Sequence, residues 1–332
     1  MPWYYDDPNS AQKSSINTKS LVTSSIRNSI IVAVIDSGVN SNHPSLKGKI
    51  ISGYDMVSPE INPRGSRSSN HLPDASDAKC PATDTENPSS TNHGTEVASV
   101  IVGNGELDVV GINPAVKILP VRAVGPCEAN YKDLIDSILW SAGIHVDGAP
   151  DNPSPAKILN ISMAGGHTFC SDELQDTVNK VLAKGSYIIS AAGNTFGKPA
   201  QEPSVCEGVI SVGSVNPDKS LSFFSPNDPR ILVYTPGGGK NIFDSITNKI
   251  RVASYKEDAI GSFEAVASDK GMGTSFSSPM VAGIAADIIS RNSSITPQEL
   301  ITKIVQYTPA DPSTGYRILN YEQLKNYITN NN

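Results

Sequence analysis

The 332-residue sequence contains few charged residues and no long apolar run. Asp, Glu, Lys and Arg make up 18% of the chain, against about 25% in typical soluble domains. No stretch reaches the roughly 18 apolar residues of a membrane-spanning helix. The polar N-terminus also has neither the basic nor the apolar segment of a signal peptide. These absences exclude a membrane protein, and we expect no signal peptide in this chain.

Basic residues are also scarce. The 26 Lys and Arg residues are outnumbered by 33 Asp and Glu residues, which gives a net charge of −7, and there is no long basic run. Because nucleic-acid binding requires clustered Lys and Arg that neutralise phosphates, we exclude nucleic acid as a partner. Apolar residues reach 38%, which is enough for a core. The composition therefore leaves one large globular domain or two small ones.

The chain has only four cysteines, and none of them forms a CxxC pair. No cluster of Cys and His has the spacing of zinc ligands, so we expect no structural metal site. An even cysteine count with low charge favours a secreted protein with two disulfides. Four buried free thiols in a cytosolic enzyme are the alternative. The cysteines are Cys80, Cys127, Cys170 and Cys206.

Short apolar runs alternate with helical patterns along most of the chain. Residues 30–35 form a continuous β-branched run, typical of a strand that is buried on both faces. Further strands are expected at 117–124, 157–163, 186–191, 209–215 and 231–233, and helices at 131–143 and 172–183. The alternation predicts an α/β fold with a mostly parallel sheet and helices on both faces.

Three segments do not follow this alternation. Residues 1–26 are polar, and we expect them to form an N-terminal arm on the surface. Residues 57–91 are rich in Ser and Pro and form a polar insertion that is too long for an ordinary connection. Residues 237–270 mix Gly with short polar stretches, which predicts a β-hairpin or a loop. We find neither an internal repeat nor an interdomain linker, and therefore expect one domain over 27–332.

Three residues with catalytic side chains are expected at one edge of the sheet. Asp36 directly follows the run at 30–35, and His93 opens a segment with helical spacing of apolar residues. Ser275 precedes Pro279, which a helix tolerates only near its N-terminus. Helices that follow parallel strands begin at the carboxyl edge of the sheet, where active sites of such folds lie. The three residues therefore converge on that edge.

The chemistry of these side chains is complementary. A serine hydroxyl is a weak nucleophile that needs a hydrogen-bonded base, and histidine is suited to this role near neutral pH. A buried carboxylate fixes the histidine tautomer and stabilises the imidazolium. The backbone N–H of Ser275, at a helix N-terminus, can stabilise an oxyanion, and Asn194 is expected to provide the second donor.

Four sequence blocks, in this order, resemble the subtilisin-like serine peptidases, or subtilases. They are "DSG" at 36–38, "HGT" at 93–95, "AAGN" at 191–194 and "GTSFSSP" at 273–279, and the resemblance extends from about residue 27 to 332. It implies a three-layer fold and a secreted endopeptidase that hydrolyses proteins through an Asp36–His93–Ser275 triad and an oxyanion hole with Asn194. It also implies a monomer that needs no cofactor for catalysis and whose inhibitory pro-segment is removed on maturation. This chain would then be the mature form.

The chain is most similar to the disulfide-containing secreted bacterial subtilases, through "ILPVRAVGPC" at 118–127 and the contexts of the last two cysteines. That resemblance implies the pairs Cys80–Cys127 and Cys170–Cys206. It also implies that an extended peptide adds a strand between 128–130 and 162–165, beside a small-walled, uncharged pocket for the residue before the cleaved bond. Glu128 either favours a basic residue upstream or is a solvated loop charge. The expected substrate-binding residues are Glu128, Ala129, Asn130, Tyr131, Ser162, Met163, Ala164 and Gly165.

The sequence departs from the family pattern at several positions. Glu96 and Ser99 replace the second His and the Gly of HGTHVAG, and Met280, which we expect to pack in the core, stands where His is common. Ser45 replaces an aspartate of the usual calcium site, so structural calcium is not supported there. Carboxylates in the insertion are another possible site for calcium, although such groups are usually only solvated. These are Asp74, Asp77 and Asp84.

Two kinds of alternative remain at this stage. His43, in "NHP", is expected to hold a turn and not to take part in catalysis. The triad is also compatible with a peptide ligase, a pseudopeptidase that serves as a binding module, or an intracellular processing peptidase with four free thiols.

Overall fold

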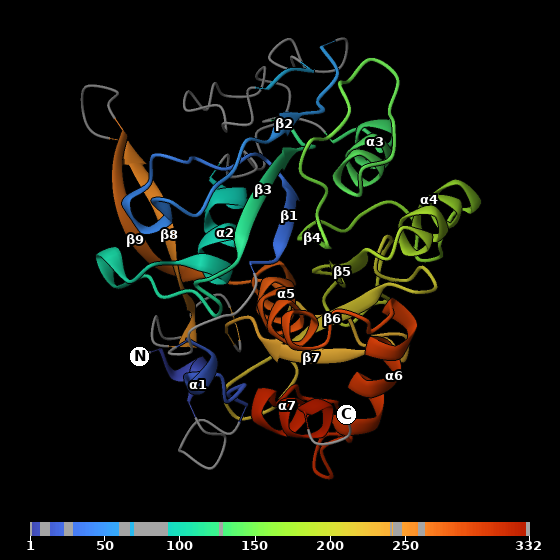
Figure 1. Ribbon diagram of the computed structural model, residues 1–332. Coiled ribbons are helices and arrows are strands. Elements are labelled where there is room, and N and C mark those ends of the chain that lie inside the picture. Colours follow the sequence, from blue (N-terminus) through green and yellow to red (C-terminus); the bar gives the residue numbers. More distant parts are fainter. Residues whose placement is uncertain are drawn as a thin grey trace.

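The computed structural model describes residues 2–6, 14–22, 29–59, 67–69, 92–125, 129–239, 241, 248–257 and 263–329. Within these residues the main sheet has seven strands in the order β2-β3-β1-β4-β5-β6-β7, and all neighbouring strands are parallel. The strands are β1 (Ile31–Asp36), β2 (Tyr54–Asp55), β3 (Lys117–Arg122), β4 (Ile158–Ile161), β5 (Tyr187–Ala191), β6 (Ile210–Val215) and β7 (Val233–Pro236). Helices flank this sheet (Figure 1), which confirms the predicted α/β class.

Helices cover both faces of the sheet in three layers (Figure 1). One face is covered by α2 (His93–Val102) and α5 (Thr274–Arg291), and the other by α3 (Tyr131–Ser141) and α4 (Asp172–Ala183). Outside α5 lie α6 (Pro297–Tyr307) and α7 (Tyr321–Thr329). The short elements of the described segments are α1 (Lys19–Val22) and the 3-10 helices η1 (Trp3–Tyr5), η2 (Pro44–Leu46) and η3 (Glu106–Asp108).

The different environments of the helices follow from their sequences. In α4 the apolar residues Leu174, Val178 and Val181 lie on one buried face while polar residues face solvent. In α5, residues 274–289 are buried on every side. Most residues on every side of this helix are apolar or small. The helix therefore forms the centre of the larger core, and this packing fixes its N-terminus at the edge of the sheet.

The segment between β7 and α5 contains an antiparallel hairpin of β8 (Ile250–Glu257) and β9 (Phe263–Gly271). A hairpin is one of the two structures that the sequence predicts for 237–270. The hairpin packs against α2, where the backbone N–H of Ala253 donates to Ser99 Oγ at 2.9 Å. The hairpin therefore supports the helix that begins at His93.

The N-terminal arm is more deeply anchored than its polar composition suggests. Tyr4, Tyr5, Ile16 and Leu21 are fully buried and join the core around α2 and α5. The Tyr5 hydroxyl also donates to the Val110 carbonyl at 3.0 Å. The described part of the arm therefore contributes side chains to the core and does not simply lie on the surface.

Within the predicted insertion at 57–91, the structure describes residues 57–59 and 67–69. Arg67 forms ion pairs with Asp133 at 2.8 Å and with Asp136 at 2.7 Å, which join this segment to α3. Residues 60–66 and 70–91 lie outside the described residues. In the described part of the chain, no helix is long and apolar enough to span a membrane.

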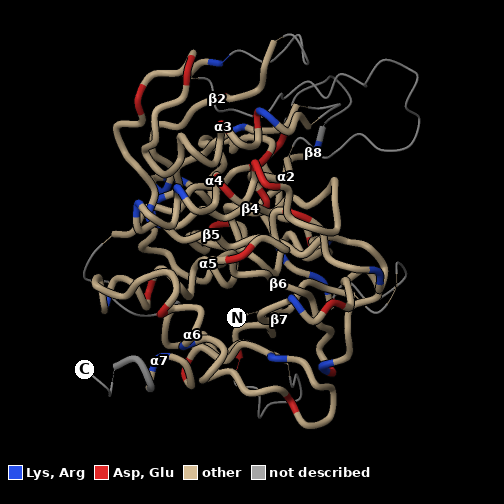
Figure 2. Tube along the Cα trace, turned by 90° about the vertical axis from the view of Figure 1, so that its right-hand side faces the viewer, with Lys and Arg blue, Asp and Glu red and all other residues tan. Residues whose placement is uncertain are grey.

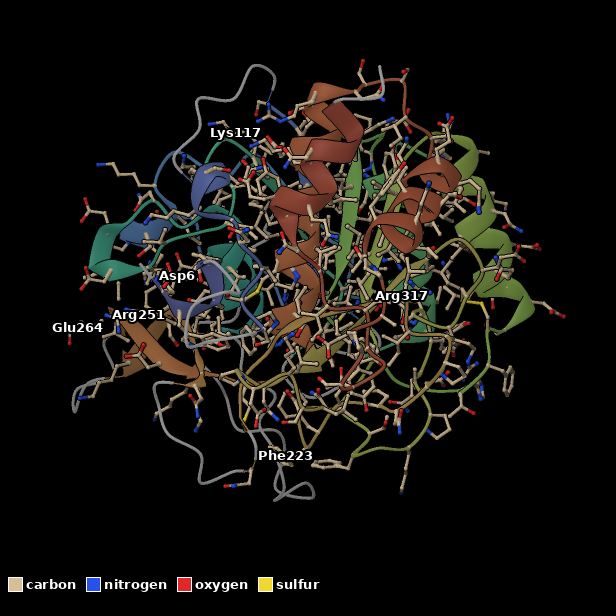
Figure 3. All side chains as sticks on the ribbon, turned by 90° about the horizontal axis from the view of Figure 1, so that it is seen from below. Asp6, Lys117, Phe223, Arg251, Glu264 and Arg317 are labelled. Atoms are coloured by element: carbon tan, nitrogen blue, oxygen red, sulfur yellow. A yellow bond between two sulfur atoms is a disulfide. The ribbon has the colours of Figure 1, made fainter. Side chains whose placement is uncertain are left out.

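Because the strands of the main sheet are parallel, their amino ends lie at one edge of the sheet and their carboxyl ends at the opposite edge. Lys117, the first residue of β3, and Phe223, in the segment that follows β6, lie at opposite ends of the molecule in Figure 3. The end with Phe223 is the carboxyl edge of the sheet, and the N-termini of α2 and α5 begin there. In the view of Figure 2, acidic and basic residues are interspersed along the described parts of the chain.

Candidate active site

Asp36 and His93 form a hydrogen-bonded pair at the carboxyl edge. Asp36 is the last residue of β1 and is 1% exposed, and His93 is the first residue of α2. His93 Nδ1 lies 2.9 Å from Asp36 Oδ1 and 3.0 Å from Oδ2. Because a carboxylate only accepts, Nδ1 is the donor, which leaves Nε2 of the neutral ring with a lone pair.

A glycine permits this close approach of α2 to β1. A Cβ atom on Gly94 would lie 2.2 Å from the Gly38 carbonyl oxygen, so no larger residue fits without movement of the backbone. The Gly94 N–H donates to Ser37 Oγ at 3.1 Å, and the Ser37 N–H donates to Asp36 Oδ1 at 2.7 Å. Ser37 and Gly94, which follow Asp36 and His93 in their sequence blocks, therefore hold the carboxylate against the imidazole.

The electrostatic surroundings of His93 favour a base that works near neutral pH. Burial by itself lowers the pKa of the imidazole, but the charge and hydrogen bond of Asp36 outweigh it, and Glu96 adds to them, so the pKa rises to about 8. Burial also raises the pKa of Glu96, whose carboxylate accepts a hydrogen bond from Ser254 Oγ at 2.9 Å. The residue that replaces the family's second histidine thus links α2 to the hairpin.

Ser275 and Asn194 meet at the N-terminus of α5. A Cβ atom placed on Gly273 would lie 3.0 Å from Ser275 Oγ and 3.3 Å from Asn194 Nδ2. The two polar groups therefore face the same small space, which the absence of a side chain at Gly273 leaves open. The φ angle of Gly273 is +147°, a region that L residues rarely adopt. Glycine is therefore required at position 273 both for the open space and for the φ angle.

Thr274 orients the Asn194 side chain. Its backbone N–H and its hydroxyl donate to Asn194 Oδ1 at 3.1 Å and 3.2 Å. With the amide oxygen engaged in this way, Nδ2 is the part of the Asn194 amide that can donate into the space beside Gly273. This is the orientation that a hydrogen-bond donor to a developing oxyanion requires.

The His93 and Ser275 elements are adjacent, although the two side chains share no hydrogen bond in this structure. The imidazole of His93 lies beside the ring of Phe276, with the ring centroids 5.7 Å apart. Phe276 directly follows Ser275 in α5, so the histidine is at the start of the helix that carries the serine. In enzymes without substrate, catalytic hydrogen bonds are often long and shorten when the complex forms.

A cavity of about 300 Å³ is lined by six of the eight residues expected to bind substrate. These are Ala129, Asn130, Tyr131, Met163, Ala164 and Gly165. Glu128 lies outside the described residues. Ser162 is absent from the lining, because its hydroxyl donates to the Ser275 carbonyl at 2.9 Å and bonds to Ser278 Oγ. Ser162 thus connects β4 to the start of α5.

The sequence predicts a pocket with uncharged walls, but one residue that lines the cavity is acidic. Glu202 lines the cavity that Ala164 and Gly165 also line, together with Leu134 and Pro203. The only local signal is the dipeptide Glu-Pro in a polar loop, which is typical of an exposed turn. The loop folds back beside Gly165 through a hydrogen bond from the Gly165 N–H to the Glu202 carbonyl at 3.2 Å.

The expected disulfide Cys170–Cys206 is present, with a Cα–Cα distance of 4.9 Å. It joins the segment before α4 to the segment before β6 and so connects two chain regions next to the cavity. Cys80 and Cys127 lie outside the described residues, and their pairing stays a prediction.

His43 holds a turn, as the sequence predicts. It is fully buried, caps η2 by accepting from the Ser45 N–H at 3.2 Å, and contacts the carbonyl groups of Ser254 and Val266. Met280 is fully buried in the core, as expected for a packing residue.

The residues at the family's usual calcium position do not fit a cation. Ser45 is fully buried, and its hydroxyl donates to the Glu106 carbonyl at 2.8 Å, so this oxygen already serves a loop contact. Asn104 Nδ2 similarly donates to the Pro44 carbonyl at 2.9 Å. Within the described residues, no group of three or more His, Cys, Asp or Glu side chains has the arrangement of a metal site. Asp74, Asp77 and Asp84 lie outside them.

The raised pKa of His93 predicts the pH dependence expected if this residue is the general base. A general base must be neutral, so we expect kcat/KM to rise through an apparent pKa of about 8, and to fall about tenfold per pH unit well below it. Glu96→Gln removes a negative charge and should move this midpoint to lower pH. Initial rates between pH 5 and 10 measure both midpoints. An unchanged midpoint in Glu96→Gln, or a wild-type midpoint at or below 6.5, would contradict this assignment.

Comparisons with known proteins agree with this geometry. A model of the subtilase family matches residues 27–324. The extracellular basic protease of Dichelobacter nodosus is 35% identical over 296 residues, which cover 84% of this chain and 46% of that protein. An extracellular protease of Xanthomonas campestris is 32% identical over 269 residues, 77% of this chain and 43% of that protein.

The chain thus spans less than half the length of these two relatives. Among solved structures, a protease from Pseudoalteromonas arctica superposes with a TM-score of 0.82 at 27% identity, covering 97% of this chain and 99% of that chain. The order of the motifs, the fold and the family match lead to one conclusion: the chain belongs to the subtilase family.

Proposed function

We propose that this chain is a secreted serine endopeptidase that hydrolyses peptide bonds of proteins. The observation that carries the proposal is the joint placement, at one sheet edge, of a hydrogen-bonded Asp36–His93 pair and of Ser275 facing Asn194. This is the set of groups that acyl transfer requires: a nucleophile, an oriented base and a donor for the oxyanion.

In the proposed reaction, Ser275 Oγ attacks the carbonyl carbon of the scissile peptide bond while His93 Nε2 takes its proton. Asp36 holds Nδ1–H and stabilises the imidazolium that results. The oxyanion accepts hydrogen bonds from Asn194 Nδ2 and the Ser275 backbone N–H. The imidazolium then protonates the leaving amine. A water molecule, deprotonated by the same histidine, releases the acyl group from Ser275.

Substrate binding is proposed to use the main chain on both sides of the cavity. Residues 129–131 and 163–165 supply the two walls, and an extended peptide between them would form a short strand through backbone hydrogen bonds. Ser162 would act by holding the start of α5, since its hydroxyl is engaged with the Ser275 carbonyl. Binding of this kind places many different sequences across the catalytic serine.

Two observations support the location outside the cytosol. The relatives from Dichelobacter nodosus and Xanthomonas campestris are named extracellular proteases, and disulfides such as Cys170–Cys206 persist in oxidising compartments. An inhibitory pro-segment and a monomeric state are part of the same proposal. Catalysis would need no cofactor.

The experiment that tests this function is digestion of a denatured protein by the purified chain, with the products identified by mass spectrometry. The proposal predicts internal cleavage with new free amino and carboxyl termini. Peptides joined to an added amine in place of water would indicate a ligase, and peptide that binds without being cut would indicate a binding module.

Asn194→Ala should weaken transition-state stabilisation and leave substrate binding nearly unchanged. Because the ground-state carbonyl oxygen does not need this donor, we expect kcat to fall by about 10²–10³-fold, the loss known for the side-chain oxyanion donor of subtilisin, while KM changes little. Steady-state kinetics on a single peptide separate the two constants. A rise in KM at constant kcat would assign Asn194 to substrate binding.

A further inference from the structure

A carboxylate lies in the otherwise apolar or neutral wall of the cavity beside the candidate active site. Glu202 is 3% exposed and is the only charged residue among those that line the cavity in the described structure. The surrounding side chains include Val124, Leu134, Met163 and Pro203. Charged residues are rarely buried without a partner, so this position calls for a physical explanation.

The surrounding backbone holds the carboxylate firmly in place. The Glu202 N–H donates to the His167 carbonyl at 3.0 Å, and the Glu202 carbonyl accepts from the Gly165 N–H at 3.2 Å. A Cβ atom on Gly166 would lie 2.8 Å from Glu202 Oε1, so the glycine leaves the space that the carboxylate occupies. The side chain is therefore placed by the segment that also forms the cavity wall.

The hydrogen-bond donors to Glu202 are neutral. Oε2 accepts from the Ser171 N–H at 3.3 Å, and the Tyr131 hydroxyl lies 3.5 Å away and is itself hydrogen-bonded to Ser171 Oγ. Among the described residues, no Lys, Arg or His forms an ion pair with Glu202. Two long neutral contacts do not replace the hydration of a carboxylate, so its negative charge is only partly compensated.

Tyr131 connects this charge to the expected substrate site. Burial raises the pKa of its phenol, and the nearby charge of Glu202 contributes to the same shift, so the hydroxyl stays a donor at neutral pH. Tyr131 also lines the cavity, as do Ala164 and Gly165. A side chain that enters the cavity would therefore contact apolar groups and come close to Glu202, whose carboxylate has free acceptor capacity.

We propose that Glu202 makes this cavity selective for a basic substrate side chain. The aliphatic stem of a lysine or arginine would contact the apolar wall, and its cation would pair with the carboxylate, which the protein otherwise leaves without a cation. This inference rests on the proposed endopeptidase function and assigns a specificity-determining residue to it. Lysine is the side chain used to test it.

The test compares peptides that differ only at one of the four positions before the cleaved bond. Each position carries lysine, norleucine or Nε-acetyl-lysine in turn. The last two side chains keep the aliphatic stem and lack the charge of lysine. At one position, lysine should be favoured over both neutral side chains by roughly 10- to 100-fold in kcat/KM, the range for a hydrogen-bonded charge. Glu202→Gln, which keeps one side-chain oxygen as an acceptor and removes the charge, should abolish that preference.

Glu207→Gln is the matched control, because Glu207 belongs to the same loop and is exposed. It removes the same charge and should leave the lysine preference unchanged. Equal cleavage of lysine and neutral peptides by the wild-type protein at all four positions would overturn the inference, whether or not Glu202→Gln folds. Cleavage of the neutral peptides would show in that case that the endopeptidase proposal stands without it. Failure to cleave any peptide would count against both.

Discussion

Replacing Ser275 with alanine is expected to lower kcat for peptide hydrolysis by on the order of 10⁶-fold, the magnitude known for the nucleophile of subtilisin. The substitution removes the only atom proposed to form a covalent bond with the substrate. It should leave the fold intact, because Ser275 Oγ is not among the hydrogen bonds that hold the start of α5; Ser162 binds the backbone carbonyl of residue 275 instead. Steady-state kinetics on a single peptide measure the loss, and the protein concentration is determined by a method that does not depend on activity.

Ser290→Ala is the matched control for this prediction. Ser290 lies in the last turn of the same helix, where its hydroxyl donates to the Asp287 carbonyl at 2.7 Å, far along the helix from Asn194. The Ser290→Ala variant should hydrolyse the peptide at the rate of the wild type. If Ser275→Ala retained a rate within tenfold of the wild type, the nucleophile would be another group.

Asp36→Asn is expected to lower kcat by about 10⁴-fold while the structure stays folded, as for the equivalent change in other serine proteases. The amide is isosteric and still accepts the Ser37 N–H through its oxygen, which lies 2.7 Å away in the carboxylate. However, it has no negative charge, and its NH₂ group can face His93 Nδ1. That arrangement favours the tautomer whose Nε2 carries the proton and cannot accept one from Ser275.

The same substitution gives a second, independent readout. Because Asp36 is the main group that raises the pKa of His93 against the effect of burial, Asp36→Asn should lower that pKa, which a titration of the imidazole by NMR measures. Thermal unfolding of both proteins checks that the fold is retained. A kcat reduced less than tenfold, with an unchanged imidazole pKa, would mean that Asp36 does not act on His93.

The elements that the sequence predicts well are those with strong local patterns. The apolar face of Leu174, Val178 and Val181 predicts a helix over 172–183, and α4 has the same bounds. The run at 30–35 similarly corresponds to β1, which begins and ends one residue later. Such patterns report burial on one face or on both, and burial in turn reflects the sheet and its covering layers.

Elements that depend on distant contacts are less predictable. β2 has only two residues, Tyr54 and Asp55, and it exists because β3 offers a free edge. In the N-terminal arm, Tyr5 and Ile16 are separated by polar residues, so no periodicity marks them, yet both are buried in the core cluster that includes α2 and α5. Their burial depends on segments that are remote in sequence: the Val110 carbonyl accepts from the Tyr5 hydroxyl, and the Tyr321 N–H donates to the Ile16 carbonyl.

The same distinction applies to the candidate site. Asp36, His93, Asn194 and Ser275 lie in short blocks whose neighbours, such as Gly94, serve local geometry and are readable from the sequence. The direction of a side chain is not readable in this way. Ser162 turns to α5, where its hydroxyl donates to the Ser275 carbonyl, and Glu202 lines the cavity because its polar loop bonds to the backbone of Gly165; only the folded chain provides these contacts.

The central claim is that Ser275 is the nucleophile activated by His93, and a fluorophosphonate probe tests it most directly. The folded chain is incubated with the probe, residual hydrolysis is followed, and the labelled peptide is identified by mass spectrometry, with heat-denatured protein as the control. The account predicts one label, on Ser275, that accumulates in proportion to the loss of activity and is absent from the denatured protein. A label on another residue, or no label on the folded protein, would contradict it.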